Sequence, residues 1–285
     1  MRKIFELLWM ILVGVSIAGC GSAENVAEEN VVWYEKAPVV CHALGRTEDG
    51  DLLTNSKEAL EYNYQWGQRV FEVDLAMTSD EVVVLRHDWD FSYGQGEDWG
   101  WTEEEKPVPD AETFLSTPIY DKYTPMSLLD LYKQMSKKKD LYVILDSKSH
   151  SDVSHQYSII VNTAIDNGYE DVLDRVIPQI YYEGMYDEIN NVYAFKEYIF
   201  TLYMIGYQGA EKVGTFCNEK GISTVVMPYE WFGAPEGEAL KEYSLQIYVH
   251  TVNEMPGAEK MIQCGADGIY TDHILPEVIE ELKEK

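Results

Sequence analysis

Positive charge is scarce in this 285-residue chain. Only 22 Lys and Arg residues stand against 50 Asp and Glu residues, and the formal net charge is −28. A protein with this balance repels nucleic acid and anionic membrane surfaces at long range. We therefore expect no nucleic-acid partner. An anionic substrate would need local positive charge from a metal ion, Lys or Arg.

Cysteine is also rare, with four residues in the whole chain. Beyond Cys20, near the N-terminus, only Cys41, Cys217 and Cys264 remain. Their number is odd, and no spacing is typical of a metal cage or a disulfide framework. We predict that these three are buried apolar thiols.

Long apolar runs are missing except near the N-terminus. Residues 1–19 begin with Arg2 and Lys3, and an apolar stretch follows from Leu7 to Val15. The stretch is shorter than the roughly 20 residues that a membrane-spanning helix needs. A basic start, an apolar middle and small residues at the end are typical of a secretory signal.

The signal ends Ile17-Ala18-Gly19-Cys20, which resembles a bacterial lipobox. That resemblance implies removal of residues 1–19, a lipid on Cys20 and an extracytoplasmic protein anchored to a bacterial membrane. An ordinary secretory signal is the alternative. Residues 20–36 begin with small and acidic residues and are predicted to be a tether. Residues 37–285 are then one domain.

Short β-rich runs alternate with helical patterns along that domain. Repeated strand-helix units of this length predict an α/β fold, a (β/α)8 TIM-type barrel. The nine candidate strands are 38–42, 69–75, 81–87, 141–148, 175–181, 197–204, 222–228, 244–250 and 267–272.

Two features make the predicted barrel irregular. The turn at Thr78-Ser79-Asp80 is too short for a helical crossover, so the strands on either side should pair antiparallel. After the third strand, residues 91–124 form an insertion rich in Gly, Trp, Tyr and acidic residues. Loops after barrel strands lie on the active-site face. We interpret the insertion as a partial lid or substrate-binding flap, and an insertion without function is the alternative.

Acidic side chains occur within two of the apolar strands. Glu72 and Asp74 are two residues apart, so they project from the same face of a strand. Asp146 and Lys148 have the same spacing. Buried carboxylates are costly unless they are paired or bind a metal. Three carboxylates from two strands suit a hard cation, Ca²⁺ or Mg²⁺.

Two histidines end predicted strands near these acids. His42 ends the first strand and His87 ends the third, so both can reach the C-terminal mouth of a barrel. Histidine titrates near neutrality and suits general acid-base catalysis. Each residue also has a simpler interpretation, because Glu72 and Asp74 could face solvent and His42 could be a core residue. The prediction of an active site therefore depends on the complete set of acids and histidines in this order, and not on any one residue.

The order of these motifs resembles the glycerophosphodiester phosphodiesterase family, in the superfamily of phosphatidylinositol-phospholipase-C-like barrels. The matching stretches cover about residues 38–285. They are His42-Ala43-Leu44-Gly45-Arg46, Thr54-Asn55-Ser56, Glu72 and Asp74, Thr78 to Glu81, His87-Asp88, Asp146-Ser147-Lys148, His250 to Asn253, and Gly265 to Asp272.

The resemblance implies a metal-dependent phosphodiester hydrolase that acts on glycerophosphodiesters or related phospholipid or polymer head groups. In it, Glu72, Asp74 and Asp146 would hold Ca²⁺ or Mg²⁺, and His42 and His87 would be general base and general acid. Lys148 would hold the phosphate.

Three positions depart from the family pattern. Ala43 stands where the family has Arg, which leaves Arg46 or Arg86 as replacements. Asp146 replaces a Glu, and His250 replaces a Trp that packs on substrate. Two alternatives remain open: a metal-independent phospholipase-C-like lyase, and a non-catalytic binding lipoprotein on the same barrel.

Overall fold

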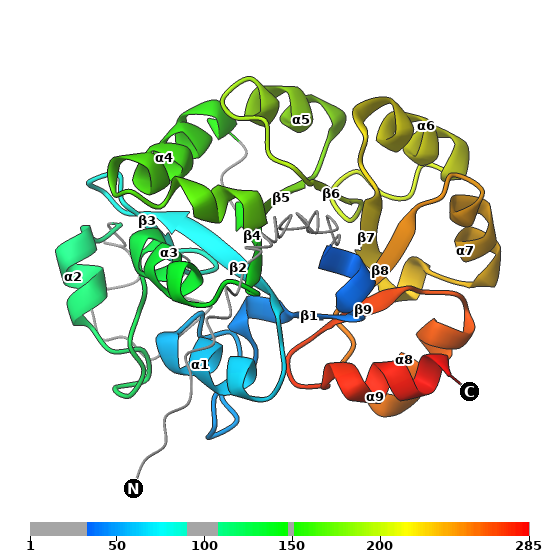
Figure 1. Ribbon diagram of the computed structural model, residues 1–285, viewed down its shortest axis with the longest axis horizontal. Coiled ribbons are helices and arrows are strands. Elements are labelled where there is room, and N and C mark those ends of the chain that lie inside the picture. The colour runs from blue at the N-terminus through cyan, green and yellow to red at the C-terminus, as the bar shows by residue number, and fades with distance from the viewer. Residues whose placement is uncertain (1–32, 90–107, 148–150, 285) are drawn as a thin grey trace, which may run out of the picture. The chain divides into compact units, whose positions relative to one another are not determined.

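The computed structural model describes residues 33–89, 108–147 and 151–284. Eight parallel strands close into a barrel, because β1 pairs with both β9 and β2. Helices surround the ring of strands (Figure 1). The predicted TIM-type barrel is therefore confirmed. Its strands are β1 (Val39–Cys41), β2 (Val70–Met77), β4 (Tyr142–Ser147), β5 (Val176–Ile180), β6 (Ile199–Thr201), β7 (Thr224–Pro228), β8 (Gln246–His250) and β9 (Gly268–Thr271).

The ninth strand, β3 (Val83–Leu85), lies outside the ring. It pairs antiparallel with β2, with Leu75 opposite Leu85 and Met77 opposite Val83. This is the hairpin that the short turn after β2 predicts. Its consequence is that the residues after β3 run back along β2 toward Asp74, whose backbone oxygen accepts the Arg86 N–H at 3.0 Å.

The helices begin and end where local chemistry favours it. The Ser56 hydroxyl accepts a hydrogen bond from the Ala59 N–H at the start of α1, and Ser127 and Asp130 form a capping box at the start of α3. Gly221, with a φ of 70°, ends α6. The helices are α1 (Lys57–Gln65), α2 (Ala111–Ser116), α3 (Leu128–Lys137), α4 (Val153–Asp166), α5 (Glu183–Asn190), α6 (Ala210–Lys220), α7 (Ala234–Lys241), α8 (Met255–Gln263) and α9 (Pro276–Lys283).

The barrel interior has an apolar lower layer and a polar upper layer. Val40, Ile144 and Tyr270 belong to one buried apolar cluster. Two residues further along the chain stand His42, just after β1, Asp146, within β4, and Asp272, just after β9. These three polar groups thus follow strands whose inward residues pack in the apolar cluster.

A short 3-10 helix, η1 (Trp33–Lys36), packs beneath this layer. The Trp33 ring is 2% exposed, and its centroid lies 5.4 Å from that of Tyr248. Trp33 and Tyr34, at the end of the predicted tether, belong to the apolar cluster of the barrel interior. Residues 1–32, with the predicted signal and Cys20, lie outside the described residues.

The insertion after β3 is described only from residue 108 onward. There, α2 packs against the outer hairpin, with Phe114 buried and its ring 5.6 Å from that of Trp89. Residues 91–107 of the predicted lid lie outside the described residues. Elsewhere, Cys41 and Cys217 are buried as predicted, whereas Cys264 is half-buried. In the described ranges, no helix is long and apolar enough to cross a membrane.

Candidate active site

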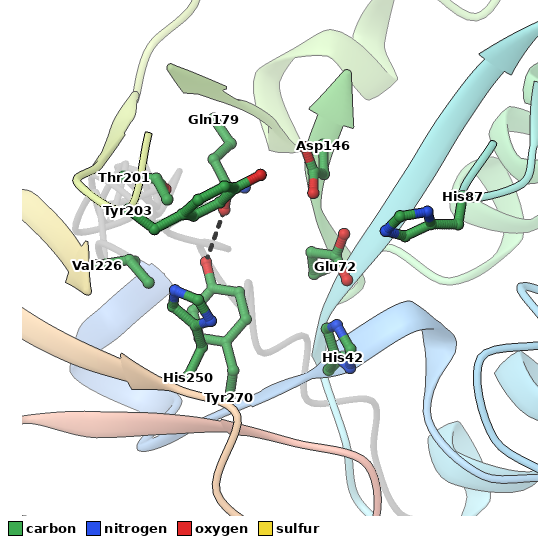
Figure 2. Close-up of a pocket in the computed structure, with 10 residues that line it drawn as sticks. All are labelled: His42, Glu72, His87, Asp146, Gln179, Thr201, Tyr203, Val226, His250 and Tyr270. Carbon is green, nitrogen blue, oxygen red and sulfur yellow. Dashed lines mark hydrogen bonds between the residues drawn. The ribbon is translucent and has the colours of Figure 1, made fainter. Parts of the chain in front are cut away.

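A cavity of about 170 Å³ opens at the carboxyl ends of the barrel strands. Five of the predicted site residues line it, and the other lining residues come from β5 to β9 and the loop after β6. Figure 2 shows His42, Glu72, His87 and Asp146 on one side of the cavity, and His250 with the residues from β5 to β9 on the other. The lining residues are His42, Glu72, His87, Asp146, Gln179, Thr201, Tyr203, Val226, His250 and Tyr270.

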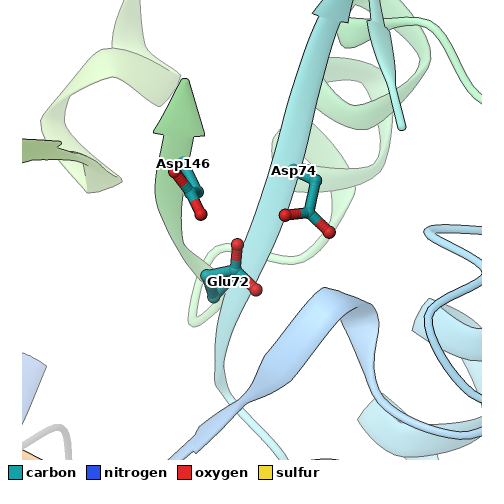
Figure 3. Close-up of side chains that lie close together, drawn as sticks. All are labelled: Glu72, Asp74 and Asp146. Atoms are coloured by element: carbon teal, nitrogen blue, oxygen red, sulfur yellow. The ribbon is translucent and has the colours of Figure 1, made fainter. Parts of the chain in front are cut away.

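The three predicted metal ligands lie together (Figure 3). Glu72, Asp74 and Asp146 are 2%, 1% and 6% exposed, and each offers an oxygen within 4.8 Å of the others. Asp74 and Asp146 are direct neighbours in the register of β2 and β4. Side chains alternate between the two faces along each strand, and this alternation brings the three carboxylates together. No bend or bulge in either strand is required.

Protein donors fix one oxygen of each carboxylate. Glu72 Oε2 accepts the backbone N–H of Ala43 at 2.7 Å. Asp74 Oδ2 accepts the side-chain amide of Asn55 at 2.8 Å. The hydroxyl of Tyr181 donates to Asp146 Oδ1. The orientation of all three acids is therefore built into the fold.

The set fits a hard divalent cation. Two like charges about 4 Å apart repel by on the order of 4 kcal/mol at an effective dielectric constant of about 20. Three buried carboxylates at this separation are therefore strongly unfavourable unless a cation or a proton neutralises them. Oxygen-only ligands are the set that Ca²⁺ and Mg²⁺ prefer. Lys148, the predicted phosphate ligand, lies outside the described residues.

His42 is held by a carboxylate from the far end of the chain. Its Nδ1 lies 2.9 Å from Asp272 Oδ1, and Asn253 Nδ2 donates to the other Asp272 oxygen at 2.5 Å. Burial lowers the pKa of His42, but the hydrogen bond to Asp272 and the charges of Glu72, Asp272 and Asp74 outweigh burial and raise that pKa to about 9. A ring held at Nδ1 presents Nε2 to the cavity.

His87 is held in the same way by its neighbour. Its Nδ1 lies 2.6 Å from Asp88 Oδ2. The side chains of His42 and His87 are 25% and 26% exposed, so both rings are reachable from solvent. Two imidazoles, each oriented by an acid, thus border the carboxylate cluster. This arrangement can accept and donate protons at one bound group.

The two candidate arginines lie away from the cavity lining. Arg46 is exposed, and its guanidinium carbon lies 5.8 Å from the centroid of the Tyr62 ring. Arg86 is 5% exposed, and its Nε donates to the backbone oxygen of Asp88 at 2.5 Å. Among the described residues, no Arg or Lys lines the cavity.

The opposite wall was mostly missed in the sequence. Gln179 Nε2 donates to the Tyr181 hydroxyl at 2.8 Å, and the Tyr270 hydroxyl donates to Gln179 Oε1 at 3.4 Å. The His250 ring lies 5.7 Å from that of Tyr203. Burial, and then the negative charge of Asp146, raise the pKa of Tyr181, which keeps its hydroxyl protonated.

A usable signal for this wall was present. Gln179 and Thr201 each stand two residues beyond an inward apolar residue, Ile177 and Ile199, near the end of a strand. Residues two apart on a strand point to the same face, so the side chains of Gln179 and Thr201 also point into the barrel.

Comparison with known proteins gives the fold. No protein-family model and no curated protein matches the sequence. A glycerophosphodiester phosphodiesterase from Parabacteroides distasonis is similar in structure, with a TM-score of 0.67 and 19% identity over 87% of this chain and 98% of that chain. A Thermotoga maritima glycerophosphodiester phosphodiesterase has a TM-score of 0.60 and 19% identity, over 87% and 98% of the two chains.

A third similar structure is an Oleispira antarctica phosphodiesterase in complex with the product sn-glycerol-3-phosphate. Its TM-score is 0.68 at 14% identity, over 89% of this chain and 99% of that chain. The chain therefore has the barrel fold of the glycerophosphodiester phosphodiesterases, along nearly the whole length of those proteins.

Proposed function

We propose that the protein is a phosphodiester hydrolase of the glycerophosphodiester phosphodiesterase type, acting on glycerophosphodiesters or related head groups. The observation that carries this proposal is the meeting of three buried carboxylates and two histidine-carboxylate pairs at one small cavity. The fold that the chain has in common with solved phosphodiesterases supports it.

In this proposal the histidines move the protons. The negative charges of Glu72 and Asp74 help to raise the pKa of His42, and a bound cation would offset them. His42, held at Nδ1 by Asp272, then takes a proton from the attacking hydroxyl, which belongs to the substrate or to water. His87, held by Asp88, gives a proton to the leaving oxygen. The two hydrogen-bonded carboxylates fix the tautomer and the direction of each ring.

Glu72, Asp74 and Asp146 would hold the divalent cation, Ca²⁺ or Mg²⁺. When bound, the cation neutralises the cluster and stabilises negative charge on a phosphoryl oxygen. The neutral wall with Gln179, Tyr203 and His250 would contact the group attached to the phosphate. Lys148, directly after β4, remains the predicted phosphate ligand.

The decisive experiment measures hydrolysis by the purified full-length chain. The substrates are glycerophosphocholine, glycerophosphoinositol and bis-p-nitrophenyl phosphate, with EDTA and then with added Ca²⁺ or Mg²⁺. We expect hydrolysis that EDTA stops and metal restores. Hydrolysis of none of the three substrates, with metal present, would contradict the proposal and favour a binding protein.

The metal-independent lyase makes the opposite prediction, because its activity would not respond to EDTA. In such an enzyme an Arg takes the place of the cation. Arg46 and Arg86 both lie outside the cavity lining, which favours the metal-dependent hydrolase.

We also propose that the protein is extracytoplasmic and anchored to a bacterial membrane by lipid on Cys20. The motif Ile17-Ala18-Gly19-Cys20 supports this proposal. We expect the full chain to fractionate with membranes and the Cys20→Ser variant to be absent from them. Equal membrane association of both forms would contradict the anchor.

A further inference from the structure

Asp146 differs from the other two carboxylates in the donor that holds it. Glu72 and Asp74 are held by a backbone N–H and an amide next to β1 and α1. Asp146 is held by the hydroxyl of Tyr181, a side chain that follows β5 and is 0% exposed. The Tyr181 ring also lies 5.2 Å from that of Tyr203, in an edge-to-face arrangement.

The direction of the Tyr181 hydrogen bond follows from the chemistry of its partners, since an ionised carboxylate can only accept. A phenol has one proton, and Gln179 Nε2 donates to the Tyr181 oxygen at 2.8 Å. The Gln179 amide is oriented in turn, since its Oε1 accepts from the Tyr270 hydroxyl. With its oxygen accepting from Gln179, Tyr181 has its proton available for Asp146 Oδ1.

Asp146 needs such a donor for a physical reason. It stands directly beside Asp74 in the register of the two strands, so ionised carboxylates here repel each other. Rotation of Asp146 away from Asp74 would relieve that repulsion and remove a ligand from the cluster. The hydrogen bond from Tyr181 opposes this rotation.

We infer that Tyr181 is a positioning residue, which orients Asp146 for the cation and so sets the affinity of the site. The inference rests on the metal site proposed above. Donors that hold metal-ligating carboxylates in this way typically change metal affinity by about 10- to 100-fold when they are removed. Tyr181 touches no reacting atom in this role.

The test is calorimetric titration of the metal-free full-length chain with MgCl₂ and, separately, with CaCl₂, in the absence of substrate. We expect Tyr181→Phe to weaken Mg²⁺ binding by about 10-fold or more. The loss for Ca²⁺ should be smaller, because Ca²⁺ tolerates irregular coordination whereas Mg²⁺ demands near-octahedral geometry. A merely structural role would not change the two affinities unequally.

Tyr157→Phe is the matched control. Tyr157 is also a fully buried tyrosine, its hydroxyl has no hydrogen-bond partner among the described residues, and it does not line the cavity. We expect both of its metal affinities to match the wild type. Should Tyr181→Phe fail to fold, Gln179→Leu takes its place, since it keeps the phenol but removes the donor that orients it. That variant should weaken Mg²⁺ binding in the same direction.

Unchanged Mg²⁺ affinity in Tyr181→Phe, or in Gln179→Leu where it replaces the first variant, would overturn the inference. An equal loss in Tyr157→Phe would also overturn it, because any lost buried hydroxyl would then suffice. Absence of Mg²⁺ and Ca²⁺ binding in the wild type would instead overturn the metal site itself, and the inference with it.

Discussion

The two walls of the cavity are built from different chemistry. The wall from β1 to β4 carries carboxylates and two acid-held histidines, such as Glu72 and His42. The wall from β5 to β9 carries neutral side chains, such as Gln179 and Tyr203. Figure 2 shows the two walls opposite each other. In the proposed function, the charged wall would carry out the proton transfers and the neutral wall would bind the group attached to the phosphate.

The largest effect should come from the histidines of the charged wall. We expect His42→Ala and His87→Ala each to lower kcat by about 10²- to 10⁴-fold, the usual contribution of a general acid or base. His87 is partly exposed, so its loss should change the free energy of unfolding little. Loss of His42 removes a hydrogen-bond partner of the buried Asp272 and should lower that free energy. Steady-state kinetics and thermal melts measure the two effects.

His155→Ala is the control for these variants. His155 is exposed and lies 3.2 Å from Glu81, and it does not line the cavity. Its kinetics should equal those of the wild type. Full activity in both His42→Ala and His87→Ala would rule out the acid-base assignment.

Asp74→Asn should give the next largest effect. It should change the affinity for the cation and the stability of the metal-free chain in opposite directions. The variant loses one negative charge of the cluster, so we expect Mg²⁺ or Ca²⁺ affinity to fall at least about tenfold. The metal-free chain should become more stable, because repulsion from Glu72 and Asp146 is relieved. Calorimetry and chemical denaturation in EDTA measure these opposite changes.

The control for Asp74→Asn is Asp171→Asn, which removes an exposed carboxylate paired with Lys139. It should leave metal affinity unchanged. If Asp74→Asn binds the cation as tightly as the wild type does, then Asp74 is not a ligand.

The charged wall was predicted from the sequence, whereas His250 was the one residue of the neutral wall that was predicted. Carboxylates inside an apolar strand are unusual, so Glu72 and Asp74 can be recognised in the sequence as candidate site residues. Gln179 and Thr201 are ordinary residues near the ends of strands, and only the closed barrel shows that they face the acids. The donor to Asp146, Tyr181, directly follows β5 and is 35 residues away in the sequence.

The same limit applies to the fold. The alternation of β-rich runs with helical patterns predicted all nine strands, and the short turn after β2 predicted the antiparallel hairpin. The helical patterns in the sequence correspond to α1, α3, α4, α6 and α8, whereas α2, α5, α7 and α9 show no clear pattern. They have only six to eight residues, too few for a helical period to stand out.

A smaller effect is expected from His250, on the neutral wall. Its ring lies against Tyr203 and Tyr270, and Figure 2 shows it across the cavity from Glu72. We expect His250→Ala to raise KM by several-fold while kcat changes less, the pattern for lost uniform binding of the substrate. A fall in kcat as large as that of His87→Ala would contradict the division between the walls.

The smallest effect should come from Thr224, below the cavity, and it concerns stability alone. Its hydroxyl is fully buried in the lower interior and has no hydrogen-bond partner among the described residues. Replacing an unsatisfied buried hydroxyl by a methyl group of the same shape is neutral or stabilising by up to about 1 kcal/mol. For a barrel of this size, 1 kcal/mol corresponds to a rise in Tm of about 2–4 °C. We expect Thr224→Val to show a rise within that limit in thermal melts, with unchanged kinetics. A clear fall in Tm would mean that the hydroxyl has a partner, such as a buried water, and that the lower layer is less apolar than its side chains indicate.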